Sequence, residues 1–270
     1  MEDTALHAAP RWVERQLTMR RPSIRRAADG YAVPDGLAEI EREMASVMNL
    51  IARTARWVHP EIFNELPIWC PDTARGRPRW NATWTEVQRD GRGREKVEEN
   101  IRAGNAFMKA LGVIGGKPPN WTCCHIWGYD DPKFAGRSSV VQDPRYYSCV
   151  GNIVWLPTPL KGFTDAVPWI KECLRVCAFH LYGFVCEVEE VRNQADRIRA
   201  GHVPEGYPTS WPTPDRHILP PGTAPESAVA RLNASKQKDR IRNQLVDPSL
   251  IHYGHDDVRR VLRFWNVDLA

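Results

Sequence analysis

Apolar residues recur every three or four positions along the chain after Pro34-Asp35-Gly36. This spacing places them on one face of a helix, with polar residues on the other face. The stripe consists of Leu37, Ile40, Met44, Val47, Met48 and Ile51. The pattern predicts an amphipathic helix that begins near Leu37 and ends before Pro60, since proline cannot continue a helix.

Helices are predicted in four later segments as well. We expect a helix from about Glu95 to Leu111 and a long helix that begins near Thr164–Pro168 and ends at Gly201. Two more helices are predicted over about 225–244 and 255–266. Most of the ordered chain is therefore expected to be helical.

Two short apolar runs differ from the helices. Residues 120–127 lie between Pro118-Pro119 and Gly128, and residues 148–156 end at Pro157. Their length and their flanking proline and glycine are typical of strands. A polar connection of roughly twenty residues separates them, and a connection of that length inside a compact unit is usually functional.

These elements predict an α+β fold that is mostly helical, with a strand–loop–strand–helix core between helical N-terminal and C-terminal additions. We divide the chain into an Arg-rich arm (1–34), a helical region expected to bind DNA (35–118), the core unit (119–200), and a Pro-rich linker with C-terminal helices (201–270). Seven of the 22 prolines fall in 201–225, which is typical of an extended linker.

Composition narrows the class of protein. Lys and Arg number 37 against 33 Asp and Glu, so the net charge is +4, which is only mildly basic. Hydrophobic residues make up 42%, which excludes wholesale disorder, and no apolar run is long enough to cross a membrane. The seven cysteines are odd in number and the N-terminal residues do not resemble a secretion signal, so we expect a cytoplasmic protein without disulfides.

Arginines are interleaved with tryptophans in the segment 72–95. This mixture can contact a nucleic-acid backbone and stack on bases, with Arg77 and Arg79 as candidate contacts. It can equally be a long loop that tryptophans hold in place, and the sequence leaves both interpretations open.

The most informative stretch is 120–165. Its first strand ends in Cys124-His125-Ile126, its second reads Asn152-Ile-Val-Trp-Leu-Pro157, and its helix opens at Thr164-Asp165. This unit resembles the HNH (ββα-metal) nuclease motif, and within that superfamily it is most similar to the restriction-endonuclease branch. The resemblance covers about 80 residues, roughly 120–200.

The resemblance implies a metal-dependent DNA endonuclease that serves in restriction or antiviral defence. His125 takes the position of the general base, because imidazole titrates near neutral pH and can accept a proton from water. One Mg²⁺ or Mn²⁺ ion is implied at the site, where it would polarise the phosphate. Asn152 takes the central Asn position, which either orients the base or binds the metal.

Other positions of the motif are matched less closely. The family often has a His nine or thirteen residues beyond the Asn, and these positions hold Lys161 and Asp165. Asp165 is a hard oxygen ligand, so we predict it as the metal ligand, and we predict that Lys161 binds a phosphate. Arg145 either clamps a phosphate through its planar guanidinium or forms a loop salt bridge.

One departure concerns the residue before the base. Many members have Asp or His there as a metal ligand, whereas this chain has Cys124, a soft thiol that suits Mg²⁺ poorly. Three explanations of Cys124 are open: an acid from the loop binds the metal instead, the site binds a softer ion, or the domain is catalytically weak. His180, on the predicted long helix, is either a replacement ligand or a core histidine. The loop acids are Asp130, Asp131 and Asp143.

The remaining cysteines allow a second metal. Cys173 and Cys177 lie four apart on one helix, and with Cys123 or Cys149 they could hold a structural zinc ion, or all could be buried free thiols.

We therefore carry two hypotheses. The first is an HNH-type DNA endonuclease, for which a homodimer is one expectation because cutting two strands commonly uses a symmetric pair. The second is a catalytically degenerate HNH-fold subunit that binds nucleic acid or serves assembly, which Cys124 and Lys161 would explain. A purely structural helical protein ranks last, because it leaves the hairpin pattern to chance.

Overall fold

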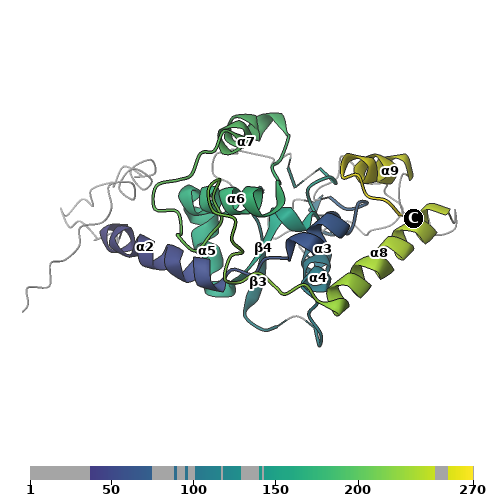
Figure 1. The fold of residues 1–270 in the computed structure, drawn as a ribbon, viewed down its shortest axis with the longest axis horizontal. Helices are drawn as coiled ribbons and strands as arrows, with labels where there is room; N and C mark the ends of the chain where they lie inside the picture. The colour runs from purple at the N-terminus through teal and green to yellow at the C-terminus, as the bar shows by residue number, and fades with distance from the viewer. Residues whose placement is uncertain are drawn as a thin grey trace, which may run out of the picture.

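The computed structural model describes residues 37–74, 88–89, 95–96, 101–116, 118–128, 140–141, 143–246 and 255–269. The protein is α+β and mostly helical, as the sequence predicts (Figure 1). The helices are α2 (Leu37–Thr54), α3 (Pro60–Glu65), α4 (Ile101–Ala110), α5 (Thr158–Ala166), α6 (Pro168–Tyr182), α7 (Arg192–Arg199), α8 (Ala228–Val246) and α9 (His255–Phe264). The strands are β1 (Gln88–Arg89), β2 (Glu95–Lys96), β3 (Trp121–His125) and β4 (Ile153–Pro157).

The hairpin of β3 and β4 lies at the centre of the molecule. Its antiparallel register pairs Trp121 with Pro157 and His125 with Ile153. Both strands were expected, but residues 148–152 are a turn and a short 3-10 helix (Val150–Asn152) rather than part of the second strand. Helix α5 follows β4 directly and packs on both strands.

Two distant segments extend this hairpin by backbone hydrogen bonds. Arg56 and Trp155 exchange bonds, in which the N–H of Arg56 lies 2.8 Å from the carbonyl oxygen of Trp155 and the reverse bond is 3.2 Å. Trp57 in turn donates to the carbonyl of Gly222 (3.1 Å). Arg56 therefore pairs with β4 at Trp155, and residues 222–224 pair in turn with the far side of Trp57.

The long helix predicted from about 164 to 201 is wrong in its continuity, because the structure has three helices there. Val167 precedes Pro168 and is extended (φ −115°, ψ 98°), which separates α5 from α6. Gly183 has a positive φ of 68° and ends α6 as a left-handed cap. The helix expected from Glu95 also begins later, at Ile101, since residues 95–96 form β2.

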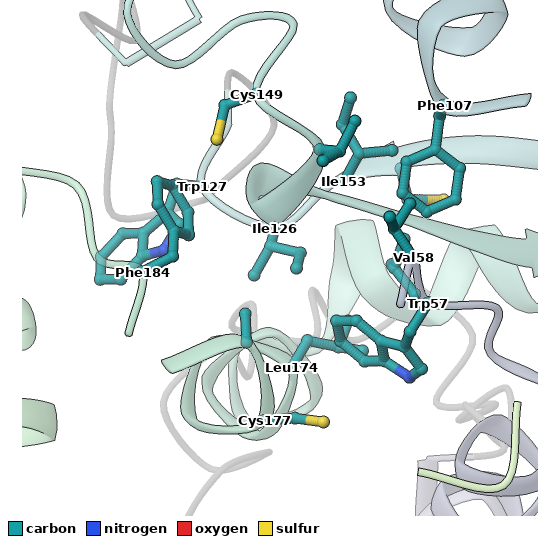
Figure 2. Close-up of a cluster of buried hydrophobic side chains, with 14 of the residues drawn as sticks. Trp57, Val58, Phe107, Ile126, Trp127, Cys149, Ile153, Leu174, Cys177 and Phe184 are labelled. Carbon is teal, nitrogen blue, oxygen red and sulfur yellow. The ribbon is translucent and has the colours of Figure 1, made fainter. Parts of the chain in front are cut away.

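The core lies between the hairpin and the helices around it. Figure 2 shows Ile126, from the loop after β3, and Leu174 of α6 in one cluster with Trp57 and Phe107. The Pro-rich segment 201–225 contains no helix or strand, but it packs on this core, because Trp211 is fully buried and its indole donates to the carbonyl of Ala52 (3.2 Å). None of the described helices combines the length and hydrophobicity that crossing a bilayer requires.

Candidate functional site

His125 is the last residue of β3, and two contacts fix its ring. Its Nε2 lies 2.8 Å from the backbone carbonyl oxygen of Tyr147, and its imidazole stacks on the Tyr147 ring with centroids 5.3 Å apart. A carbonyl oxygen only accepts hydrogen bonds, so Nε2 carries the proton and Nδ1 holds the lone pair of the neutral ring. His125 is 9% exposed.

Asn152 holds the backbone on both sides of this imidazole. Its side chain is fully buried, and its Oδ1 accepts from the N–H of Trp127 (2.8 Å). Its Nδ2 donates to the carbonyls of Trp127 (3.1 Å) and Tyr146 (3.2 Å). These contacts fit the predicted role of Asn152 in orienting the base. They do not support its predicted role as a metal ligand, because its amide oxygen is buried and already accepts a hydrogen bond from the backbone.

Replacing Asn152 with alanine is expected to lower the free energy of unfolding by about 3 kcal/mol or more. Three buried backbone groups of Trp127 and Tyr146 would lose their partner, and each unsatisfied group costs roughly 1–3 kcal/mol. Urea denaturation measures the loss, with Asn193→Ala on the exposed side of α7 as control. A loss equal to that of the control would show that the three hydrogen bonds of Asn152 contribute nothing to the free energy of unfolding.

Arg145 forms the loop salt bridge that was one of its two expected roles. Its Nε and Nη2 donate to both carboxylate oxygens of Asp143, at 2.7 to 3.1 Å, and this pairing raises the pKa of Arg145. The fork predicted to clamp a phosphate is therefore already occupied. Asp143 is 3% exposed and bound to Arg145, so it is not the loop acid that reaches a metal.

The residues at the remaining motif positions gather on α5 and the adjoining face of β3. Lys161 donates from Nζ to Oδ2 of Asp165 one turn further along α5, and the Cys124 thiol on β3 donates to the backbone carbonyl of Thr122 (3.7 Å). Burial raises the pKa of Cys124 to about 12, and the nearby Asp165 also raises it while Lys161 lowers it. Cys124 is therefore a neutral thiol at physiological pH.

These residues do not fit the divalent ion that the resemblance implies. Asp165 is paired with the Lys161 ammonium, and Cys124 is protonated. Successive strand residues point to opposite faces, so Cys124 and His125 point away from each other. Within the described ranges, no three His, Cys, Asp or Glu side chains come together as a group that could hold a metal.

The cysteines on α6 are core residues, and His180 near the end of the same helix is half-buried. His180 packs edge-on against Phe179, its Nε2 is buried with no hydrogen-bond partner in the structure, and burial lowers its pKa. Burial also raises the pKa of Cys173 and of Cys177 well above the usual range of a thiol. These properties favour the buried free thiols over the zinc site among the two alternatives.

Several predicted residues lie outside the described part of the chain. These are Arg77, Arg79, Asp130, Asp131 and the arm 1–34, so their expected contacts with DNA or metal stay predictions.

Sequence reasoning missed Arg175, which supports the residues that follow His125. Arg175 is 1% exposed, its Nε donates to the carbonyl of Ile126 (3.1 Å), and its guanidinium lies 4.6 Å from the centre of the Trp127 ring. Its position between Leu174 and Val176, on a mostly apolar helix, was the only sequence signal.

The arrangement as a whole is an imidazole at the end of a central hairpin, with its Nε2–H bonded to the Tyr147 carbonyl and its ring stacked on the Tyr147 ring. Such a ring can accept a proton from water through Nδ1 while Nε2–H remains bonded to the Tyr147 carbonyl. Comparisons with protein-family models, with curated proteins and with solved structures found no match to this chain.

Proposed function

We propose that the protein is an HNH-type phosphodiester hydrolase that acts on DNA, with His125 as its general base. The observation that carries this proposal is the orientation of His125 at the end of β3, through the hydrogen bond from Nε2 to the Tyr147 carbonyl. The order of β3, β4 and α5, with α5 packed on both strands, also supports a ββα core.

In the proposed reaction, Nδ1 of His125 takes a proton from the attacking water. The water oxygen then forms a bond to phosphorus as the bond from phosphorus to the leaving oxygen breaks, and the leaving oxygen keeps the electron pair of that bond and takes a proton from solvent. The hydrogen bond from Nε2 to Tyr147 becomes charge-assisted once the ring is protonated, which stabilises the imidazolium. Asn152 contributes by holding the Tyr146 carbonyl next to this acceptor.

A second candidate function is a non-catalytic HNH-fold subunit that binds nucleic acid or serves assembly. The observation that favours it is the protonated Cys124 beside the Lys161–Asp165 ion pair, at positions where the resemblance implies metal ligands. An ammonium group cannot ligate a metal, but it can contact a phosphate.

Supercoiled plasmid distinguishes the two functions. The full chain is incubated with plasmid in EDTA, in Mg²⁺ and in Mn²⁺, and we expect nicked or linear DNA in at least one of these conditions. A salt-dependent gel shift without cleavage in any condition would overturn the hydrolase in favour of the binding subunit. Absence of both cleavage and binding would contradict both functions.

A further inference from the structure

The C-terminal residues after α9 contact the turn that orients His125. Trp265 donates from its indole Nε1 to the backbone carbonyl of Arg145 at 2.7 Å, across 120 positions of sequence. The indole ring is held in turn by Phe184, stacked at 5.8 Å, and by Phe63, edge-on at 6.0 Å. The position of Trp265 is therefore set by the core and not by α9 alone.

Phe264 contacts the same turn from α9. The Arg145 guanidinium lies 4.9 Å from the centre of the Phe264 ring, and the Tyr146 ring meets Phe264 edge-on at 5.8 Å. Arg145 is therefore held at two points. Asp143 binds its guanidinium, and Trp265 binds its backbone carbonyl.

The turn at residues 143–148 carries these contacts to the imidazole. The N–H groups of Tyr146 and Tyr147 both donate to the carbonyl of Asp143, at 3.0 and 3.1 Å. The carbonyl of Tyr147, two residues beyond that of Arg145, accepts the hydrogen bond from His125. A displacement of the Arg145 carbonyl therefore moves the acceptor that sets the His125 tautomer.

We propose that Trp265 is a positioning residue for His125. Its indole N–H holds the 143–148 turn in the geometry in which Tyr147 accepts from Nε2, and this keeps the lone pair of the neutral ring on Nδ1. The effect on cleavage rests on the proposed function, but the effect on the tautomer does not. The colours of Figure 1 show that α9 belongs to the last part of the chain and β3 to a much earlier part. The contact between Trp265 and the 143–148 turn therefore exists only in the folded molecule.

The test compares Trp265→Phe with Trp211→Phe. Both changes remove an indole hydrogen bond to a backbone carbonyl, but Trp211 bonds to Ala52 and does not contact the turn. Nitrogen-15 NMR of the histidine rings reports the tautomer, and the His125 signals are those that disappear in His125→Gln. We expect His125 in the Nε2–H form in the parent protein and in Trp211→Phe, and a mixture of both tautomers in Trp265→Phe.

Cleavage rates provide a second measurement. If the protein cleaves DNA, we expect Trp265→Phe to lower the single-turnover rate by roughly tenfold, since small displacements of a catalytic group are costly. An unchanged His125 tautomer in folded Trp265→Phe would overturn the proposal, as would the same tautomer change in Trp211→Phe. A tautomer change in Trp265→Phe alone, in a protein that cleaves nothing, would support the positioning role and reject only the hydrolase.

Discussion

Replacing His125 with glutamine is expected to lower the rate of DNA cleavage by about 100- to 10,000-fold, the contribution typical of a general base. The glutamine amide can still donate a hydrogen bond to the Tyr147 carbonyl, but it cannot accept a proton from water at neutral pH. The loss should appear in single-turnover cleavage of plasmid, under the conditions in which the parent protein is active.

His217→Gln is the matched control for this change. His217 is exposed and lies far along the chain from the hairpin, so we expect parental rates of cleavage. A gel shift with His125→Gln should show unchanged DNA binding, since a base that acts on water contributes little to affinity. Cleavage by His125→Gln at the parental rate would remove His125 from the chemistry.

Replacing Gly222 with alanine is expected to cost about 4 kcal/mol or more of the free energy of unfolding, enough to leave a substantial part of the protein unfolded. A Cβ atom at this position would lie 1.7 Å from the carbonyl oxygen of Ala55 and 2.9 Å from its carbonyl carbon. The backbone must move to relieve this overlap, but Arg56 is hydrogen-bonded to Trp155 of β4, and Trp57 is hydrogen-bonded to Gly222 and Ala224. Thermal unfolding followed by circular dichroism measures the change.

Gly162→Ala provides the comparison, because it adds the same methyl group at an exposed position of α5. Nothing lies within 4 Å of a Cβ atom there, and alanine is the better helix former by about 1 kcal/mol. We expect this variant to be as stable as the parent or more so. Equal stability of the two variants would mean that the close approach at Gly222 is not as the structure has it.

Local pattern predicted the elements whose residues all lie within one segment. The stripe that includes Met44, Met48 and Ile51 gave the helix that α2 forms, and those three side chains are buried. The hairpin also followed from local signals, because proline and glycine bound its two apolar runs. The prediction of one long helix was wrong because Pro168 and Gly183 each interrupt the helix at a single backbone position. The spacing of apolar residues does not reveal such interruptions.

The candidate site depended on contacts that no local pattern contains. The spacing from Asn152 led to Lys161 and Asp165, but the ion pair between them forms one turn apart on α5 and occupies the carboxylate. Arg145 could be assigned to a phosphate or to a salt bridge, and only the folded turn pairs it with Asp143. The hydrogen bonds of Arg175 and Trp265 could not be predicted from local pattern, because their partners are 49 and 120 positions away.

The pairing of Trp57 with residues 222–224 also has a consequence for synthesis on the ribosome. The segment 55–57 can bind β4 as soon as β4 has emerged, but its other edge receives Gly222 and Ala224 only when most of the chain has been translated. Until then the Trp57 backbone presents an unpaired strand edge, the kind of surface that chaperones protect in nascent chains. We therefore expect a ribosome-bound nascent chain that ends before residue 222 to be protease-sensitive around Trp57.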